Sequence, residues 1–295
     1  MKQFCRDIAI TLALVTIVVL GLEVQTRLSY SDNRFSFKYR YMETNASKIK
    51  TLLLGHSLFE ESFNSNVLGD STFNLAICGR VSFYDVRLLE KYLDSMVNLK
   101  VVLFPIHYAL DNPCDYFGDR QGKETYVYHY YKYMKIETPG SMRLYYLPKL
   151  TYQWEKKHSG MMPGVADSVD NSGYAKLSDY KGKIYPPSKR RYTQAYSETF
   201  CNNLRIIAQM CYDRQIRFIA VTPPVTDVYL SYTNQDGIRL LYDIVEQVRK
   251  DYPIEYHNYL EDPSFRSDSL YYDSSHLNHN GATLFARRVK EDFAL

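Results

Sequence analysis

The sequence has little of what would indicate a nucleic-acid-binding protein or a structural metal site. Its 295 residues include one tryptophan and five cysteines, and no two cysteines form a Cys-x-x-Cys pair. A structural zinc site is therefore not expected. The net charge of +3 comes from scattered basic residues, without an arginine-rich arm or a nucleic-acid motif. We therefore expect no nucleic acid among the partners of this chain.

Charge is also missing from residues 8–22, which are apolar apart from two threonines. The run is intermediate in length between the core of a signal peptide and a full membrane span. No small-x-small cleavage site follows it, which favours an uncleaved anchor over a removed signal segment. Lys2 and Arg6 precede the run, so the body is expected on the extracytoplasmic side, in the periplasm or at the cell surface. Cleavage would make the protein secreted.

The rest of the chain divides by composition. Residues 1–23 are interpreted as the anchor or signal segment, and the polar and aromatic residues 24–48 as a stalk. Residues 49–295 are interpreted as one domain. Within it, residues 111–196 hold about half of the 29 tyrosines and interrupt an otherwise regular pattern. We interpret them as an insertion that covers the domain.

Short apolar runs in the body alternate with segments of helical spacing. The expected strands are Leu52–Leu54, Thr72–Ile77, Val101–Phe104, Ile216–Val221 and Ile254–Tyr256. After the second strand, Ser82 is expected to cap a helix, with Asp85 three residues later as its capping-box partner. Strands alternating with helices favour an α/β fold, a three-layer sandwich around a central parallel sheet of about five strands.

Two short motifs at opposite ends of the body indicate nucleophilic chemistry. Gly55-His56-Ser57 follows the first strand, and Asp273 lies three residues before His276 near the C-terminus. A serine hydroxyl becomes nucleophilic when an imidazole takes its proton and a carboxylate orients that imidazole. Singly, Ser57 and Asp273 could be helix caps and His276 a buried, hydrogen-bonded histidine. Their occurrence together favours catalysis.

The expected topology brings further residues to the same place. Ligands of a parallel α/β sheet sit beyond the carboxyl ends of its strands. Ser57 follows the first strand, Gly79 the second and His107 the third. Asp273 and His276 follow the last. We therefore expect one site at this edge of the sheet.

These motifs resemble those of the SGNH (GDSL-type) hydrolase superfamily. The resemblance is carried by Gly55-His56-Ser57, by Asn74-Leu75-Ala76 with Gly79, and by Asp273 to Asn278 with Gly281. It is greatest for the membrane-anchored cell-envelope branch, which includes the D-alanyl transfer protein of teichoic acid and the alginate-type O-acetyltransferases. It implies a flavodoxin-like fold from about residue 50 onward, outside the tyrosine-rich insertion, and no metal or organic cofactor.

The resemblance implies a role for each site residue. Ser57 is the expected nucleophile, His276 the general base and Asp273 its orienting partner. The backbone N–H groups of Ser57 and Gly79 are expected to form the oxyanion hole, where one such donor is typically worth about 3 kcal/mol. Asn278 is expected to position the turn before the last helix.

The chain departs from the family pattern at two positions. His56 stands where the family usually has an Asp that is not the triad acid. The family's third block normally supplies an Asn side chain to the oxyanion hole, in a Gly-x-Asn-Asp pattern, whereas this chain has Phe104 to Tyr108. Either His107 replaces that donor, or the hole has two backbone donors and His107 is a packing residue. The envelope branch often lacks this Asn, which favours a transferase over a fast hydrolase.

Tyr126, Tyr128 and Tyr130 belong to a crowded aromatic segment of the insertion. Such clusters usually pack in a core or a cap, but exposed rings can also stack on sugars. Both interpretations stay open, and the second makes the three tyrosines substrate-binding residues.

The expected function is that of a serine O-acyltransferase acting on an extracytoplasmic polysaccharide or envelope glycan through an acyl-Ser57 intermediate. The implied partners are a glycan acceptor, an acyl donor, a membrane O-acyltransferase protein that supplies the acyl group, and the membrane itself through the anchor. Two alternatives stay open: an esterase of the same fold, and a catalytically silent glycan-binding or scaffold protein. An intact triad separates both enzymes from the silent protein.

Overall fold

The computed structural model describes residues 2–28, 33–107, 124–137, 169–178, 184, 198–233 and 235–295. Most of the tyrosine-rich insertion lies outside these ranges. Helix α5 (Glu124–Met134) belongs to the insertion, and the side chains of Tyr126 and Tyr128 on it are outside the described set. Substrate binding by these two tyrosines therefore stays a prediction.

Five parallel strands form the central sheet, as the sequence predicted. Their bounds are β1 Thr51–Leu53, β2 Thr72–Asn74, β3 Val101–Pro105, β4 Arg217–Thr222 and β5 Glu255–Asn258. The order across the sheet is β2-β1-β3-β4-β5. The chain first adds β2 on one side of β1 and then crosses over to add the other three strands. Ligands of such sheets bind where the direction of addition changes, beyond the carboxyl ends of β1 and β3.

Successive residues of each strand face opposite cores, because side chains alternate across a strand. In β1, Leu52 packs in the larger of two clusters of buried residues, and Leu53 packs in the smaller cluster on the other face. In β3, Val102 shares the cluster of Leu52, and Leu103 shares that of Leu53. The sheet is therefore buried on both faces, which explains why its strands are continuous apolar runs.

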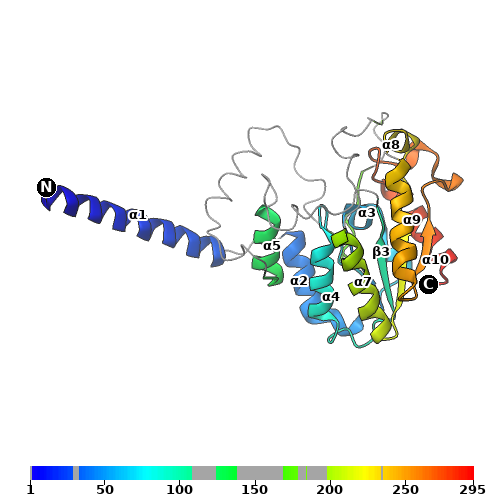
Figure 1. Ribbon diagram of the computed structural model, residues 1–295, viewed down its shortest axis with the longest axis horizontal. Helices are drawn as coiled ribbons and strands as arrows, with labels where there is room; N and C mark the ends of the chain where they lie inside the picture. The colour runs from blue at the N-terminus through cyan, green and yellow to red at the C-terminus, as the bar shows by residue number, and fades with distance from the viewer. Residues whose placement is uncertain are drawn as a thin grey trace.

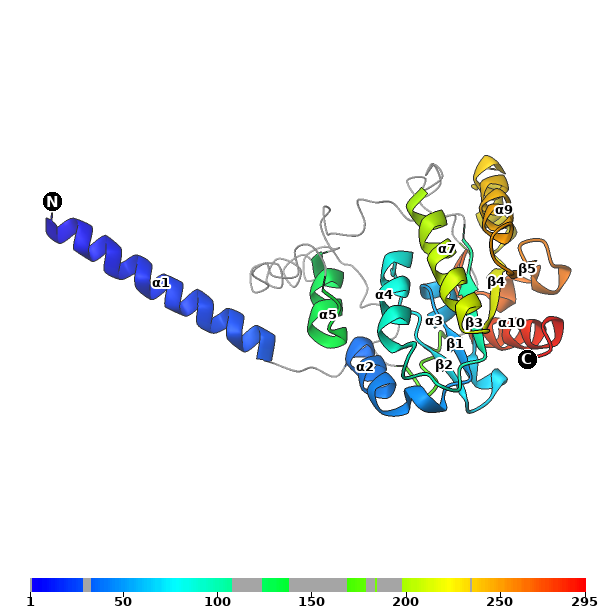
Figure 2. The same ribbon diagram turned by 60° about the horizontal axis from the view of Figure 1, so that its bottom comes forward.

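Helices cover both faces of the sheet (Figures 1 and 2). The larger cluster packs against α2 (Arg34–Asn45), α4 (Ser82–Tyr92), α7 (Glu198–Asp213) and α9 (Gln235–Arg249). The smaller cluster packs against α10 (His279–Asp292), which lies across the sheet from α4 and α7 in Figure 2. Short turns of helix complete the fold: η1 Ala46–Lys48, α3 Ser57–Glu60, η2 Ser65–Leu68, α8 Asp227–Ser231, η5 Pro263–Phe265 and η6 Asp268–Leu270. This is the three-layer sandwich that the sequence predicted.

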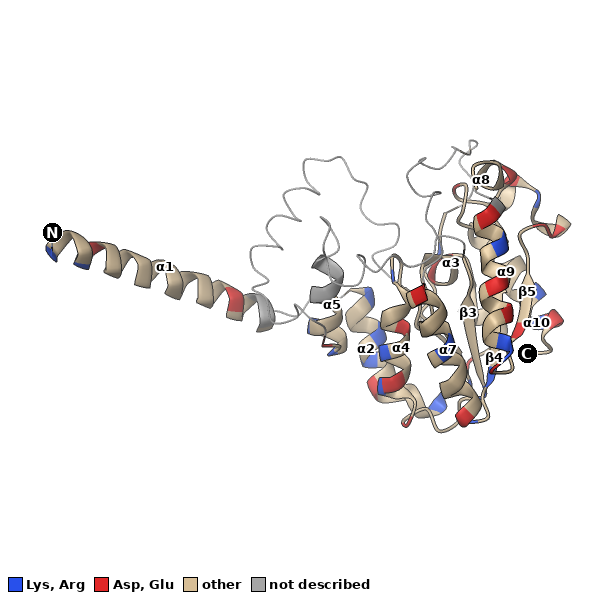
Figure 3. Cartoon of the chain, viewed as in Figure 1, with Lys and Arg blue, Asp and Glu red and all other residues tan. Residues whose placement is uncertain are grey.

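The N-terminal helix α1 (Lys2–Leu28) extends away from this body (Figure 1). By length and composition, its segment Lys2–Gln25 could cross a membrane. Figure 3 shows its charged residues toward the two ends and none in between. Its apolar side chains are exposed, as those of Ile10 and Leu12 illustrate at 52% and 62%. An anchor and a signal segment both fit this helix.

Helix α2 belongs to the folded body, which corrects the predicted stalk at residues 24–48 over the part that α2 occupies. Phe35 and Met42 of α2 are buried in the larger cluster, at 6% and 1% exposure. Lys38 lies between them on the same face and is fully buried. The polar and aromatic composition concealed this packing, because a buried lysine interrupts the apolar face that would have identified an amphipathic helix.

Candidate active site

Ser57 follows β1 on a turn that requires glycine at position 55. Gly55 has a φ of +105°, and a Cβ there would lie 2.3 Å from Cγ of Pro105. A side chain would therefore strain the backbone and collide with β3. His56 follows as the N-cap of α3, and Ser57 is the first residue of that helix. Its backbone N–H is thus one of those that have no partner within a helix.

The loop that carries Asp273 and His276 is held by its own hydrogen bonds. Oδ1 of Asp273 accepts the backbone N–H groups of Ser275 and His276, each at 2.8 Å. After the loop, Asn278 caps α10 by accepting the N–H of Gly281 at 3.0 Å. This is the turn-positioning role that the sequence suggested for Asn278. These local contacts set the direction in which the imidazole projects.

The structure brings Ser57, His276 and Asp273 together in one chain of hydrogen bonds. Nε2 of His276 lies 2.8 Å from Oγ of Ser57, and Nδ1 lies 2.9 Å from Oδ2 of Asp273. With Nδ1–H donating to the carboxylate, Nε2 is left to accept the serine O–H. The histidine side chain is 18% exposed, so the site is shielded but reachable. This geometry fits a nucleophile, its base and the group that orients the base.

The pKa of Asp273 lies well below its ordinary value. Burial raises the pKa, but the hydrogen bond and charge of His276, together with the two backbone N–H groups, outweigh burial and lower it. The carboxylate is therefore ionised across the physiological pH range. This is the charge state needed to stabilise an imidazolium.

The second predicted oxyanion donor lies on the loop after β2. Gly79 has a φ of +73°, and the N–H of Arg80 donates to the carbonyl of Ile77 at 3.0 Å, which closes a tight turn. A positive φ at the third position of such a turn favours glycine. The N–H of Ile77 donates to the carbonyl of Gly55 at 3.0 Å, so this loop runs beside the Ser57 turn. The oxyanion role of both backbone N–H groups stays a prediction.

His107 follows β3 and is buried, at 8% exposure. Its Nε2 lies 3.1 Å from the hydroxyl of Tyr229, and its ring meets that of His56 edge-on, with 5.7 Å between centroids. One of its two ring nitrogens is thus engaged within the protein. The packing role is visible in these contacts, and oxyanion donation stays a prediction.

His56 acts as a helix cap. Its Nδ1 accepts the N–H of Leu58 at 3.4 Å. Burial, together with the charges of His276 and Arg80, lowers the pKa of His56 to about 4. The ring is therefore neutral at physiological pH and can act as an acceptor. A neutral ring also avoids placing a second cation beside the imidazolium of His276.

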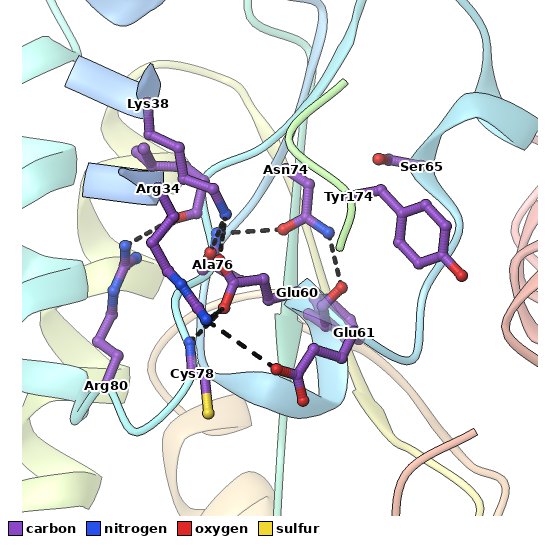
Figure 4. Close-up of polar contacts among 12 residues, drawn as sticks. Arg34, Lys38, Glu60, Glu61, Ser65, Asn74, Ala76, Cys78, Arg80 and Tyr174 are labelled. Carbon is purple, nitrogen blue, oxygen red and sulfur yellow. Dashed lines mark hydrogen bonds and ion pairs between the residues drawn. The ribbon is translucent and has the colours of Figure 1, made fainter. Parts of the chain in front are cut away.

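Glu60, the last residue of α3, lies at the centre of a buried ion cluster (Figure 4). Its Oε1 accepts from Nζ of Lys38 at 3.0 Å, and its Oε2 accepts from Nη1 of Arg34 at 2.7 Å. Oε2 also accepts the backbone N–H of Cys78 at 2.6 Å. Figure 4 shows both cations reaching from α2 toward this carboxylate. The cluster thus joins α2 to the loop that carries Gly79.

The charges of this cluster depend on one another. Burial raises the pKa of Glu60, but Lys38 and Arg34 outweigh it and lower the pKa overall. Burial lowers the pKa of Lys38 to about 8, with Glu60 acting in the opposite direction. Nζ of Lys38 also donates to the carbonyl of Ala76. Removing Glu60 would leave Lys38 with an uncompensated buried charge, whereas removing Lys38 would still leave Glu60 paired with Arg34.

Glu61 follows Ser57 by one helical turn and faces the imidazole. Its side chain is 5% exposed, and its Oε2 lies 3.8 Å from Nε2 of His276. Its Oε1 lies 3.9 Å from Nη1 of Arg34. Burial raises the pKa of Glu61 to about 7; the charge of Glu60 adds to the rise, and those of His276 and Arg34 oppose it. A carboxyl group that titrates near neutral pH therefore lies next to the imidazole of His276.

Asp85 has a different role from the predicted capping-box partner. Val81 is the N-cap of α4, and Ser82 is its first residue, so the predicted cap is wrong by one position. Asp85 is buried, and its Oδ1 accepts from Nη1 of Arg80 at 2.7 Å and from the N–H of Gly55 at 2.8 Å. It therefore holds the turn that leads to Ser57. The spacing of Asp85 from Ser82 resembles a capping box, because a capping box also has an acidic residue in the first turn of the helix.

Tyr130 is a core residue, which corrects its prediction as a substrate-binding residue. Its side chain has no exposed surface, and its ring stacks on that of Tyr84 with 3.7 Å between centroids. Its hydroxyl accepts from Nε of Arg80 at 2.8 Å. A ring without exposed surface cannot stack on a sugar, so the packing alternative describes Tyr130 correctly.

Sequence reasoning missed Lys38, Glu60 and Glu61. A signal for Glu61 was present, because it follows Ser57 by four residues, which is about one turn along a helix that starts at Ser57. The adjacent pair of acidic residues next to a buried strand was a weaker signal for Glu60. No sequence signal pairs it with Lys38, since that contact depends on how α2 packs.

The described residues contain neither a metal cluster nor a disulfide. Among them, no group of three or more His, Cys, Asp and Glu side chains is arranged to hold a metal ion. The described cysteines are free: Cys5, Cys78, Cys201 and Cys211. The thiol of Cys78 lies in hydrogen-bonding reach of the Ser57 side chain, and burial raises its pKa to about 12. Cys78 is therefore a neutral thiol beside the site and an unsuitable nucleophile at physiological pH.

Comparison with known proteins finds distant structural likeness and no sequence match. No protein-family profile and no curated protein sequence matches the chain. Similar solved structures include a Streptococcus pneumonia protein provisionally assigned as a platelet activating factor (12% identity, TM-score 0.46, covering 97% of this chain and 99% of that one). A GDSL-like lipase from Bacteroides thetaiotaomicron VPI-5482 has 12% identity and a TM-score of 0.44, covering 88% of this chain and 100% of that one. A catalytic mutant of an acetylxylan esterase from Geobacillus stearothermophilus has 11% identity and a TM-score of 0.42, covering 84% and 95%. Likeness at this level carries no conclusion about activity.

Proposed function

We propose that this protein is a serine O-acyltransferase that modifies an extracytoplasmic polysaccharide or envelope glycan. The observation that carries the proposal is the chain of hydrogen bonds from Ser57 through His276 to Asp273, at 2.8 and 2.9 Å. A silent scaffold has no need of this geometry, nor of the buried carboxylates that hold the loops around it. The site therefore supports an enzyme that acts on acyl esters.

The first half of the reaction makes an ester on the enzyme. Oγ of Ser57 attacks the carbonyl carbon of the acyl donor, and Nε2 of His276 takes the serine proton. The bond between the acyl carbon and the donor's leaving group breaks, and the leaving group takes the proton from His276. Asp273 is ionised throughout and stabilises the imidazolium. The backbone N–H groups of Ser57 and Gly79 are the expected donors to the oxyanion that forms.

The second half transfers the acyl group. A hydroxyl of the glycan attacks the acyl carbon and gives its proton to His276. Oγ of Ser57 leaves and recovers that proton, so the enzyme returns to its starting state. Water can take the place of the glycan, in which case the protein is an esterase. Transfer therefore requires the bound hydroxyl to react much faster than water; well-oriented groups reach effective molarities of about 10⁵ M or more.

Two features support transfer over hydrolysis. Helix α1 could tether the catalytic domain beside a membrane protein that supplies acyl groups. The loop after β3 carries His107 where the SGNH pattern has an Asn that donates to the oxyanion. The contact with the hydroxyl of Tyr229 engages one ring nitrogen of His107. A weaker oxyanion hole disfavours a free-standing esterase more than a transferase whose acceptor is held in place.

The test uses the full-length protein in detergent, with a small acyl ester as donor and oligosaccharides as acceptors. Wild-type protein should form an acyl adduct on the peptide containing Ser57, and acylated sugar should accumulate. Ser57→Ala should give neither. Fast hydrolysis of acylated glycans, with no acylated product when acceptors are added, would replace the transferase with an esterase. If the wild type forms no adduct and shows neither activity in the presence of source-cell membranes, the silent scaffold is the better description.

A further inference from the structure

We infer that Glu61 is a second carboxylate for His276, which stabilises the imidazolium from the side of Nε2 while Asp273 stabilises it from the side of Nδ1. The inference rests on the proposed function, because it requires His276 to accept the proton of Ser57. Glu61 acts through His276 and is therefore a positioning residue outside the triad.

The position of Glu61 is set by the backbone that carries the nucleophile. Its N–H donates to the carbonyl of Ser57 at 2.8 Å, so both residues belong to one helical turn. The 3.8 Å from Oε2 of Glu61 to Nε2 of His276 is too long for a hydrogen bond but short for two opposite charges. At 5% exposure, the carboxyl group is weakly screened by water. Above the pKa of Glu61, which burial raises to about 7, the imidazolium therefore forms next to a carboxylate that does not compete with Ser57 for the nitrogen.

Charged groups from three elements face Glu61. Arg34 of α2 lies 3.9 Å from Oε1 and favours the ionised form. Glu60 of α3 disfavours it, although Glu60 has cationic partners of its own. His276 favours the ionised form when protonated, and Asp273 from the same loop disfavours it. The balance makes the charge of Glu61 sensitive to the protonation of His276.

The remaining titratable neighbours are neutral at physiological pH. Burial, with the charges around it, lowers the pKa of His56 to about 4, and burial raises that of Cys78 to about 12. When Ser57 loses its proton, the new positive charge on His276 therefore appears between two described carboxyl groups, Asp273 on the side of Nδ1 and Glu61 on the side of Nε2. The charge of His276 therefore acts directly on the ionisation of Glu61.

Removing the charge of Glu61 should change the pKa of His276 in a direction that can be predicted. An opposite charge within about 4–6 Å raises the pKa of a histidine by about 1–3 units, so Glu61→Gln should lower the pKa of His276. The acid limb of the pH–rate profile should move to lower pH, because His276 in the variant loses its proton at a lower pH. The rate on the alkaline plateau should fall, because the imidazolium that forms during attack is less stable. A purely structural role would not produce this combination.

The experiment measures the labelling rate of Ser57 by a fluorophosphonate against pH, in the full-length protein. This reagent needs no knowledge of the natural substrate. We expect Glu61→Gln to lower the plateau rate about tenfold and to shift the acid limb down by about one pH unit. Glu61→Asp keeps the charge and should recover part of the rate. Glu90→Gln, an exposed residue on α4, removes the same charge far from the base and should change nothing.

The outcomes separate this inference from the proposed function. If the wild type does not label, the proposed function fails. If the wild type is labelled and Glu61→Gln has the same plateau rate and the same acid limb, the inference about Glu61 is wrong and the proposed function stands. The ring titration of His276, followed by NMR in histidine-labelled protein, must show the same downward shift. If Glu61→Gln does not fold, Glu61→Asp must shift the limb in the same direction by less, and an unchanged limb overturns the inference.

Discussion

The carboxylate of Glu60 accepts the backbone N–H of Cys78 at 2.6 Å, so a side chain on the helix that begins at Ser57 holds the loop that carries Gly79. A second buried carboxylate, that of Asp85, accepts the N–H of Gly55 at 2.8 Å and holds the turn before Ser57. Each is neutralised by at least one buried cation. The two loops expected to form the oxyanion hole are therefore fixed by charged side chains from within the core.

Breaking the first of these clusters should destabilise the protein and impair acylation. Glu60→Gln leaves Lys38 with an uncompensated buried charge, which typically costs about 3–5 kcal/mol. The double variant Lys38→Met/Glu60→Gln removes both charges and should be less destabilised than the sum of the two single variants. Denaturant unfolding of the full-length protein in detergent measures all three. Strict additivity would show that the contact between Lys38 and Glu60 contributes little.

Asp273→Asn should abolish most activity while the fold persists. The Asn side chain can still accept the backbone N–H groups of Ser275 and His276, but it would donate to Nδ1 and impose the wrong histidine tautomer. In serine proteases this change lowers kcat by about 10⁴, and we expect a loss of about 10²–10⁴ in the labelling rate of Ser57. The measurement is fluorophosphonate labelling beside a thermal unfolding curve. A labelling rate within a few-fold of the wild type would contradict the assigned role of Asp273.

Gly281 and Gly237 offer a matched pair of substitutions to alanine. At Gly281 a Cβ would lie 2.1 Å from the carbonyl oxygen of Leu270 and 2.8 Å from Cδ2 of Leu277, whereas at Gly237 nothing lies within 4 Å. Gly281→Ala should therefore destabilise the protein by about 1–3 kcal/mol and disturb the loop that holds His276. Gly237→Ala, inside α9, should be neutral or stabilising by about 0.5–1 kcal/mol. Equal unfolding free energies for the two variants would contradict the close packing of α10 against its preceding loop.

The N-terminal helix predicts where the body of the protein lies. Lys2 and Arg6 precede the apolar segment, so the C-terminus is expected on the extracytoplasmic side. A C-terminal reporter that is active only outside the cytoplasm should give a signal, and the protein should sediment with membranes after a salt wash. Activity of a reporter that works only in the cytoplasm would overturn this topology. A mature N-terminus near residue 24 would replace the anchor with a signal segment and leave the topology intact.

The sequence by itself determined the sheet and the order of the candidate catalytic residues. Apolar runs such as Leu52–Leu54 and Ile216–Val221 predicted buried parallel strands, because a strand covered on both faces has no polar side. The positions of Ser57, Asp273 and His276 relative to these strands then followed from parallel topology, since all carboxyl ends meet at one edge. These are properties of periodicity and chain order, which can be read without knowing any partner.

The tertiary structure alone decided which charges pair and which aromatic rings are buried. Lys38 and Glu60 are far apart in sequence, and their contact exists because α2 packs against the larger core. Tyr130 became a core residue for the same reason, since its hydroxyl meets Arg80 only after α5 packs beside α2. The nearness of Glu61 to His276 likewise depends on how the last loop folds back onto α3. Side chains of this kind have several compatible environments, and packing across distant segments selects among them.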